Sequence, residues 1–186
     1  MVNDVLKDLQ GSFDKNIEAF KRDLGKVRTG RANIAMLDGV KVEYYGTMTP
    51  LNQVATLNVP DPRLITIKPW EKSLIAGIER AIKAQSELGL NPTSDGEMVR
   101  VPIPPLTQER RKDLVKMVKK LAEEAKVALR NARRESNEML KELTDGGDIT
   151  EDDERQGLKK VQESTDKYTQ SVDDLLGKKE KEILEG

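Results

Sequence analysis

The chain contains no cysteine and no histidine among its 186 residues. Without cysteine it can form neither a disulfide nor a thiolate metal site. Without histidine it lacks the commonest metal ligand and the side chain that most often moves protons near pH 7. Together these two absences exclude Ser-His-Asp catalysis, Cys-His catalysis and histidine-bound zinc.

Two other chemical motifs are also missing. The sequence has no G-x-x-x-x-G-K-[ST] loop, so we do not expect it to hydrolyse nucleotides. The stretch "TDGGDITEDD" is rich in carboxylates, but it lacks the D-x-[DN]-x-[DN]-G spacing of a calcium loop. We therefore expect a protein that is not an enzyme, with no catalytic residue, no metal and no cofactor.

Long apolar runs are absent as well. No run approaches the roughly 18 residues that span a bilayer. The first residues, "MVNDVLKDLQ", lack the basic start and apolar stretch of a signal peptide. We expect a soluble cytoplasmic protein that has no membrane partner.

Aromatic residues make up only 3% of the sequence, whereas charged residues make up 35%. This composition is typical of long helices exposed to solvent. Three segments carry apolar residues every three or four positions, which predicts helices over about 3–28, from 107 to the "DGGD" break, and from 150 onward. In the third segment Thr150 and Asp153 have the spacing of a capping box. The predicted stripes are Leu6, Leu9, Phe13, Ile17, Phe20, Leu24 and Val27; then Leu114, Val118, Leu121, Ala125, Leu129, Ala132, Ser136, Met139 and Leu143; then Leu158, Val161, Thr165, Tyr168, Val172 and Leu175.

The middle of the chain has a different pattern. Apolar and polar residues alternate in "VKVEYYG", and "VATLNVP" and "LITIKP" flank a turn at Asp61-Pro62-Arg63. "MVRVPIP" follows a turn candidate at Asp95-Gly96, and Ser73 is positioned to cap a short helix. These signals predict a small α+β unit.

The order of these segments predicts two domains. A three-helix bundle forms from residues 1–30 and 106–186, and the α+β domain of residues 31–105 is inserted between its first and second helices. Both connections leave the same end of the bundle, which predicts a hinge at about 29–31 and 103–106. Helix stop and start signals would explain the same residues equally well. The hinge residues are Thr29, Gly30, Arg31, Pro104 and Pro105.

Positive charge is concentrated in the second helical segment. The chain as a whole has 32 basic and 33 acidic residues, but positions 110–134 hold ten basic and three acidic ones. One interpretation is a solvated helix face that pairs with the acidic third helix. The other is a surface for a nucleic-acid backbone, which the arginines of "RNARR" favour because guanidinium groups suit phosphate. The candidate binding residues here are Lys116, Lys119, Lys126, Arg130, Arg133 and Arg134.

The kind of nucleic acid follows from what the sequence lacks. Phe13, Phe20 and Tyr168 lie on apolar stripes, so no platform remains for stacking single-stranded bases. There is no base-reading helix, which argues against DNA, and no spare seam for a dimer. We expect a monomer that recognises folded RNA by shape and phosphate.

Several motifs resemble those of the bacterial ribosome recycling factor family over the whole length of the chain. The resemblance implies an L-shaped α+β molecule of tRNA-like dimensions. It consists of two domains, a long three-helix bundle and a small inserted α+β domain of β/α/β sandwich-like build, joined by a hinge. The motifs are "KVRTGRAN", "VEYYGTMTPLNQVA", "LGLNP", "RVPIPPLTQERRKDLVK", "ALRNARRE" and "ITEDDE".

The resemblance also implies a function. Members of this family bind the post-termination 70S ribosome through large-subunit ribosomal RNA. With elongation factor G and GTP hydrolysis by that partner, they split the ribosome and allow release of mRNA and tRNA. The inserted domain is the part expected to meet elongation factor G. The family's RNA-facing arginines correspond to Arg28, Arg31, Arg111, Arg130 and Arg133.

Two other functions fit the same residues. A coiled-coil adaptor would have similar apolar stripes, and a general binder of structured RNA would have a similar basic helix. The salt dependence of binding distinguishes the coiled-coil adaptor from an RNA binder. A protein that binds phosphate loses affinity steeply as salt rises, whereas one that binds an apolar helix does not. Preference for ribosomes distinguishes the second.

Overall fold

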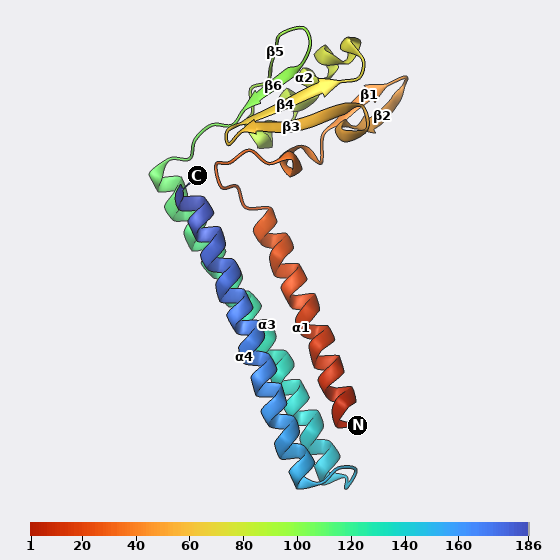
Figure 1. Ribbon diagram of the computed structural model, residues 1–186, viewed down its shortest axis with the longest axis vertical. Coiled ribbons are helices and arrows are strands. Elements are labelled where there is room, and N and C mark those ends of the chain that lie inside the picture. The colour runs from red at the N-terminus through yellow and green to blue at the C-terminus, as the bar shows by residue number, and fades with distance from the viewer. Residues whose placement is uncertain (186) are drawn as a thin grey trace. The chain divides into compact units, whose positions relative to one another are not determined.

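A computed structural model describes residues 1–185, with the side chain of residue 87 left aside (Figure 1). The chain divides into two compact units. One unit comprises Met1–Thr29 and Gln108–Glu185, and the other begins at Gly30 and ends at Thr107. The predicted α+β class with two units is confirmed.

The first unit is a bundle of three helices that run side by side (Figure 1). They are α1 (Val2–Gly25), α3 (Gln108–Asp145) and α4 (Glu151–Glu185). Each helix buries one stripe of side chains spaced three or four residues apart, as expected of helices that share a seam. The stripes include Phe13 and Phe20 from α1, Val118, Leu129 and Leu140 from α3, and Val161, Val172 and Ile183 from α4.

The buried stripes differ in places from the predicted ones. Leu140 is fully buried, whereas Met139 is exposed. The prediction followed a heptad repeat, but a straight α-helix drifts by about 20° per heptad relative to that repeat. The departures are local: Ala122 is buried in place of the predicted Leu121, and Leu140 in place of Met139, whereas Leu129, Ala132 and Ser136 are buried as predicted. At the start of α1, Val5 is buried and Leu6 is only half-buried.

The start of α4 has the predicted capping box. The Asp153 N–H donates to Thr150 Oγ1 at 3.1 Å, and the Thr150 N–H donates to Asp153 Oδ2 at 3.1 Å. Hydrogen bonds to Thr150, chiefly from its backbone N–H and to a smaller extent from its side chain, hold the pKa of Asp153 below its ordinary value. The break before this cap contains Gly147, whose φ of 76° is in the left-handed region that favours glycine.

Gly157 marks a close approach of the three helices. It is buried in α4, and a Cβ at this position would lie 3.0 Å from Leu140 Cδ1 of α3 and 3.3 Å from Val2 Cγ1 of α1. The missing side chain therefore allows both neighbours to pack against the backbone of α4.

The second unit contains two antiparallel sheets and the helix α2 (Ile75–Ala84). The small sheet pairs β1 (Lys41–Tyr44) with β2 (Thr47–Pro50). The larger sheet has the order β3-β4-β6-β5. Its strands are β3 (Ala55–Asp61), β4 (Leu64–Pro69), β5 (Thr93–Ser94) and β6 (Val99–Pro102). The short 3₁₀ helices are η1 (Ile34–Leu37), η2 (Leu51–Gln53), η3 (Lys72–Leu74) and η4 (Ser86–Leu88).

One core holds this unit together. Ile65 and Ile67 of β4 and Ile78 and Ile82 of α2 are fully buried in the same cluster. The alternating strand residues and the helix residues spaced four apart therefore meet in one apolar layer.

Ser73 does not cap α2 as predicted. It lies inside η3, and the residue that precedes α2 is Leu74, which makes no side-chain capping bond. The chain enters α2 through a helical turn, so no extended residue stands at the helix start to offer a side-chain oxygen.

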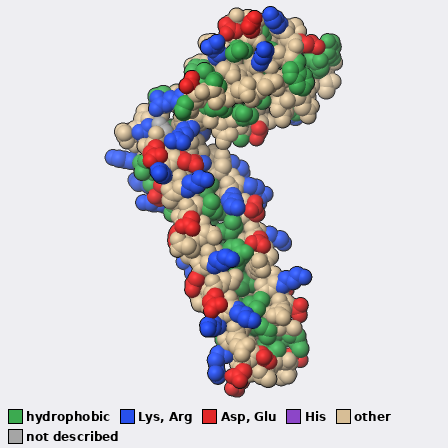
Figure 2. All heavy atoms as spheres, in the orientation of Figure 1, with side chains coloured by type: hydrophobic (Ala, Val, Ile, Leu, Met, Phe, Trp, Pro, Cys, Tyr) green, Lys and Arg blue, Asp and Glu red, His purple; other side chains and the backbone are tan. Residues whose placement is uncertain are grey.

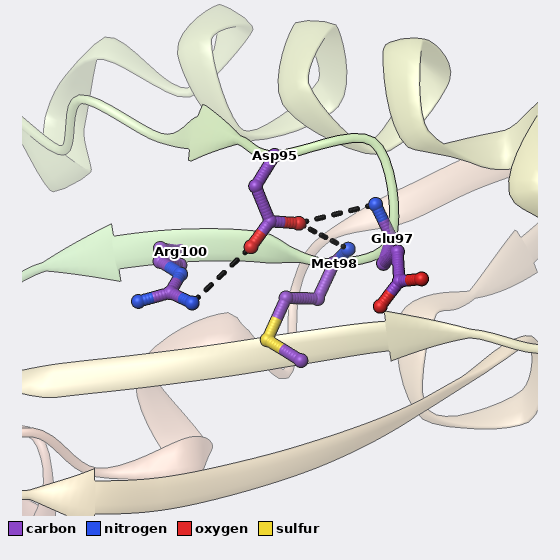
Figure 3. Close-up of polar contacts among 4 residues, drawn as sticks. All are labelled: Asp95, Glu97, Met98 and Arg100. Atoms are coloured by element: carbon purple, nitrogen blue, oxygen red, sulfur yellow. Dashed lines mark hydrogen bonds and ion pairs between the residues drawn. The ribbon is translucent and has the colours of Figure 1, made fainter.

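The turn between β5 and β6 is organised by one carboxylate (Figure 3). Asp95 Oδ1 accepts from the N–H groups of Glu97 and Met98, both at 3.1 Å. Asp95 Oδ2 lies 3.2 Å from Arg100 Nη2. The Met98 N–H, followed by the Glu97 N–H, holds the pKa of Asp95 below its ordinary value. Gly96 completes the turn with a φ of 89°.

Candidate nucleic-acid interface

The basic face of α3 consists of Lys112, Lys116, Lys119, Arg130 and Arg134. All five side chains are exposed. At 3.6 residues per turn they fall within an arc of about 60°, turned away from the buried stripe. α3 is 38 residues long, and the bundle supports it along its buried side. The result is a row of cations on a stiff support.

Four of these cations are available for a partner. Within the described residues, Lys112, Lys116, Lys119 and Arg134 make no ion pair or hydrogen bond through their side chains. Figure 2 shows that Lys and Arg side chains also gather at the end of the bundle where α3 begins. A row of unpaired cations suits a polyanion whose charges repeat along a line.

Lys126 lies beside the basic face, not on it. Its side chain is only 24% exposed, and its Nζ is 2.5 Å from Asp173 Oδ1 of α4. This ion pair joins α3 to α4. Lys126 is therefore less available to RNA than Lys116 or Lys119, although the sequence places all three in one series.

Arg130 is exposed but already paired. Its Nη2 lies 2.6 Å from Oε1 of Glu123, which belongs to the same helix. Both side chains face solvent, 45% and 62% exposed respectively. The guanidinium therefore already has a carboxylate partner within the protein.

Arg133 lies against α4 and is held loosely. Its Nη1 donates to Gln162 Oε1 at 3.4 Å, a long hydrogen bond. Its Nε is buried and has no partner among the described residues. Gln162 in turn donates to Asp166 Oδ1 at 2.8 Å. Because the Nε of Arg133 has no acceptor here, the present position of the side chain is less favourable than one in which a phosphate accepts its hydrogen bonds.

The remaining predicted arginines are not gathered on the same face. Arg28 follows α1 in the bundle, and Arg111 is half-buried in the first turn of α3. Both interact with other groups of the protein. Arg31 is exposed and belongs to the inserted unit. The sequence-predicted set is thus spread over both units.

The predicted hinge residues lie at the boundary of the units. The boundary falls between Thr29 and Gly30 on one connection and after Thr107 on the other. Gly30 has a φ of 77°, which favours glycine. Pro104 and Pro105 are exposed.

Two backbone hydrogen bonds limit how far a hinge could extend into the inserted unit. The Ala32 N–H donates to the Pro62 carbonyl at 2.6 Å, and the Ile103 N–H donates to the Arg63 carbonyl at 2.8 Å. Both bonds attach the entering and leaving chain to the same turn. Ile103 is also buried in the core of that unit, so it is anchored there.

The inserted unit has an aromatic patch that sequence reasoning missed. The patch consists of Tyr45, Met48 and Trp70; Tyr45 is 82% and Trp70 is 70% exposed. Tyr45 and Met48 line a groove of about 790 Å³ between the β1–β2 hairpin and α2. The Tyr45 hydroxyl donates to Glu71, the residue after Trp70, at 3.3 Å.

Tyr45 is held in an uncommon conformation. It has a φ of 50°, the left-handed region that non-glycine residues seldom adopt. The rings of Tyr44 and Tyr45 meet edge to face, with centroids 4.5 Å apart, and the Tyr44 hydroxyl also donates to Glu71. The hydrogen bond to Glu71 raises the pKa of Tyr44. The "YYG" sequence signals a turn, but nothing in it signals that the ring of Tyr45 stays in solvent.

The described residues, which exclude the side chain of residue 87, provide neither a carboxylate cluster for a metal ion nor a membrane-spanning helix. No group of three or more carboxylates there is placed to hold a metal ion. No helix there combines the length and the apolar character needed to cross a membrane.

The chain is similar throughout to one family of proteins. The family model described as "Ribosome recycling factor" matches residues 20–184. The ribosome-recycling factor of Myxococcus xanthus is 54% identical over 185 residues, covering 100% of both chains. That of Halalkalibacterium halodurans is also 54% identical over 185 residues and again covers 100% of both.

Two solved structures of ribosome recycling factors are also similar to this chain. The solution structure of a ribosome recycling factor matches with a TM-score of 0.77 and 40% identity, covering 100% of this chain and 98% of the other. A second match, with a TM-score of 0.66 and 42% identity, covers 99% of each chain. It is a model of the T. thermophilus ribosome recycling factor, with E. coli elongation factor G, bound to the E. coli post-termination complex.

Proposed function

The chain belongs to the ribosome recycling factor family, and from that premise we propose that it binds the post-termination 70S ribosome and splits it into subunits together with elongation factor G. The partner's GTP hydrolysis drives the step, and mRNA and tRNA are released. The protein itself acts in the cytoplasm without catalysing a reaction. The matched complex of a relative with elongation factor G on a ribosome supports this choice of partners.

The basic face of α3 is the observation that carries the proposal. Its cations are exposed and spaced along a supported helix, which suits the phosphates of folded RNA. The bundle therefore binds large-subunit ribosomal RNA, with Lys116, Lys119, Arg130 and Arg134 on the outward side and Arg133 at its margin. Arg28 and Arg111 are further RNA-binding residues of the bundle, Lys126 contributes from beside the basic face, and Arg31 contributes from the inserted unit.

The inserted unit provides a different kind of surface. Its residues 31–105 hold eight basic and eight acidic side chains, so it has no charge excess for binding phosphate. Tryptophan, tyrosine and methionine are enriched in protein–protein interfaces, and the aromatic patch exposes one of each. We assign to this patch the contact with elongation factor G.

The hinge joins the bundle, which binds RNA, to the inserted unit, which contacts elongation factor G. Gly30 and Arg31 on one connection, and Pro104 and Pro105 on the other, lie between the anchored residues of the inserted unit and the bundle. Force applied to the inserted unit by elongation factor G reaches the bundle through these two connections. The bundle then displaces the ribosomal RNA to which it is bound.

Light scattering of post-termination 70S ribosomes tests the proposal. Ribosomes are mixed with this protein, a matched elongation factor G and GTP, and with each pair of components as controls. A fall in scattering that requires all three establishes splitting. The absence of a fall with a matched elongation factor, or GTP hydrolysis by this protein alone, contradicts the proposal.

A further inference from the structure

One acidic residue interrupts the basic face of α3. In the arc that contains Lys112, Lys116, Lys119, Arg130 and Arg134, Glu123 is the single acidic side chain over residues 108–145. It lies midway along the row of cations. A carboxylate there repels the phosphates that its neighbours attract, so its presence needs an explanation.

Glu123 holds one particular cation. Its Oε1 is 2.6 Å from Arg130 Nη2, the shortest arginine–carboxylate pair among the described ion pairs. The two residues are seven positions apart, which corresponds to about 10.5 Å along a helix axis. Arg130 therefore extends back along α3 toward Glu123, and its guanidinium lies along the surface of the helix.

Stability does not explain the pair. Ion pairs that reinforce a helix are spaced three or four residues apart, where side chains are nearest neighbours. Glu123 and Arg130 are both open to solvent, and exposed pairs contribute little to folding. The buried stripe already holds this part of α3, through Ala122 and Leu129.

We propose that Glu123 is an internal competitor for RNA phosphate that sets how tightly the protein binds the ribosome. In the free protein its carboxylate occupies the guanidinium of Arg130. Binding exchanges this carboxylate for a phosphate, so only the difference between the two contacts contributes to affinity. This inference rests on the proposed function, because it assumes that the basic face binds RNA.

The consequence is that Glu123 limits the affinity of the protein for the ribosome. A protein that splits ribosomes repeatedly has to leave the large subunit after each round. Cations alone would bind a polyanion tightly, since each phosphate contact releases counterions. A carboxylate beside Arg130 recaptures the guanidinium when the phosphate contact opens, which speeds dissociation.

The neighbouring arginine provides a contrast within the same turn of the helix. Arg133 is held by the neutral amide of Gln162 at 3.4 Å and has a buried Nε without a partner. If Arg133 moves to a phosphate, it therefore loses only a long hydrogen bond to Gln162. The competition is specific to Arg130, so a neutral substitution at Glu123 should act chiefly through Arg130, with a smaller part from relieving the direct repulsion of phosphate.

The test compares Glu123→Gln with Glu124→Gln. Both substitutions remove one negative charge from an exposed position, but Glu124 lies off the basic face and makes no ion pair among the described residues. Because the chain has no cysteine, one introduced cysteine can carry a fluorophore. Equilibrium binding to purified large subunits and the dissociation rate are measured for each variant, with circular dichroism to verify folding.

We expect Glu123→Gln to bind about three- to fivefold tighter, mainly through slower dissociation, and Glu124→Gln to change affinity by less than about 1.5-fold. In an Arg130→Gln background the gain from Glu123→Gln should shrink to less than about 1.5-fold, the part due to direct repulsion of phosphate. Equal effects of the two glutamine variants, or a full gain that persists without Arg130, would overturn the inference.

Binding by the wild-type protein distinguishes a failure of the proposed function from a failure of the role assigned to Glu123. If it binds large subunits with a steep salt dependence and Glu123→Gln changes nothing, only the role of Glu123 is wrong. If the wild-type protein does not bind large subunits, the proposed function fails, and this inference fails with it.

Discussion

The two units of this chain bury mainly aliphatic cores, to which the bundle adds Phe13 and Phe20, and they expose very different surfaces. The bundle exposes charge, with ten basic and three acidic residues over positions 110–134. Its exposed apolar side chains on α3 are aliphatic: Met117, Val127 and Met139. The inserted unit is balanced in charge and exposes Tyr45 and Trp70. The surfaces of the two units therefore differ much more than their interiors do.

The largest expected effects come from core truncation in each unit. Phe13 of α1 is fully buried against Tyr168 of α4, with ring centroids 4.9 Å apart, and Ile67 is fully buried in the inserted unit. Phe13→Ala should cost about 3–5 kcal/mol of unfolding free energy and Ile67→Ala about 2–5 kcal/mol. Urea denaturation is followed by helical circular dichroism and by the fluorescence of Trp70, the only tryptophan.

These two variants test whether the two units unfold independently. If the units are independent, Phe13→Ala shifts the circular dichroism transition and leaves the Trp70 transition in place, while Ile67→Ala does the reverse. A shift of both transitions in either variant would mean that the units unfold as one.

A second prediction concerns two glycines of α4. Gly157→Val forces a side chain against Leu140 and Val2 and should destabilise the bundle by about 1–3 kcal/mol. Gly177 has open space where a Cβ would be, so Gly177→Ala should stabilise the same helix by up to about 1 kcal/mol. Thermal melts of the two variants should move in opposite directions. A melting temperature for Gly157→Val equal to wild type would refute the close packing.

A third prediction concerns RNA binding by the bundle. Arg133→Ala should weaken binding to large subunits by about 1–3 kcal/mol and reduce its salt dependence, because a charged hydrogen bond to phosphate is lost. Arg130→Ala should weaken binding less, because the guanidinium of Arg130 gives up the carboxylate of Glu123 to reach phosphate. Arg155→Ala on α4 is the matched control, since Arg155 is exposed and lies on another helix. Unchanged affinity in a folded Arg133→Ala variant would remove that residue from the interface.

A fourth prediction concerns the aromatic patch. Trp70→Ala and Tyr45→Asn should change the unfolding free energy by less than about 0.5 kcal/mol, because both side chains are exposed and asparagine tolerates the left-handed backbone. They should slow splitting by elongation factor G while binding to the ribosome stays the same. Equal loss of binding and splitting would show that the patch does not distinguish the two partners.

The smallest expected effect is a pH dependence in each unit. The pKa of Asp153 in the bundle and that of Asp95 in the inserted unit are lowered, chiefly by backbone N–H donors. Their contribution to stability is therefore present at neutral pH and is lost as pH falls through folded-state pKa values below the ordinary 3.8. Asp153→Asn should reduce the acid shift of the helical transition, and Asp95→Asn that of the Trp70 transition. An acid shift that neither variant reduces would contradict the assignment.

The sequence was a good guide where one short stretch decides the structure. The capping box of Thr150 and Asp153 depends on residues three positions apart, so it could be predicted from spacing alone. The long helices were equally clear because their apolar residues recur over many turns. Strands β2 and β5 were missed because "TMTP" and "TS" are short, polar, and formed only by pairing with a neighbour.

The candidate site was harder to predict because it depends on neighbours that spacing does not reveal. The series of basic residues groups Lys126 with Lys119, yet Asp173 of another helix pairs with Lys126. Glu123 and Arg130 are seven positions apart, a spacing that suggests no contact, and a long arginine side chain bridges it. Whether Tyr45 is buried or exposed depends on how the hairpin packs, which no local pattern encodes.

The bundle is discontinuous in the chain, and this has a consequence for how the protein is made. α1 ends at Gly25, while its partners α3 and α4 begin only at Gln108 and Glu151. During synthesis the apolar stripe of α1 emerges before its partner helices and stays uncovered while the inserted unit, which has its own core, can already fold. Closing the bundle then requires bringing distant segments together, which is slow and leaves Phe13 and Phe20 exposed to aggregation or to chaperones. α1 thus leaves the ribosome before α3 and α4 but is packed only after both have been made.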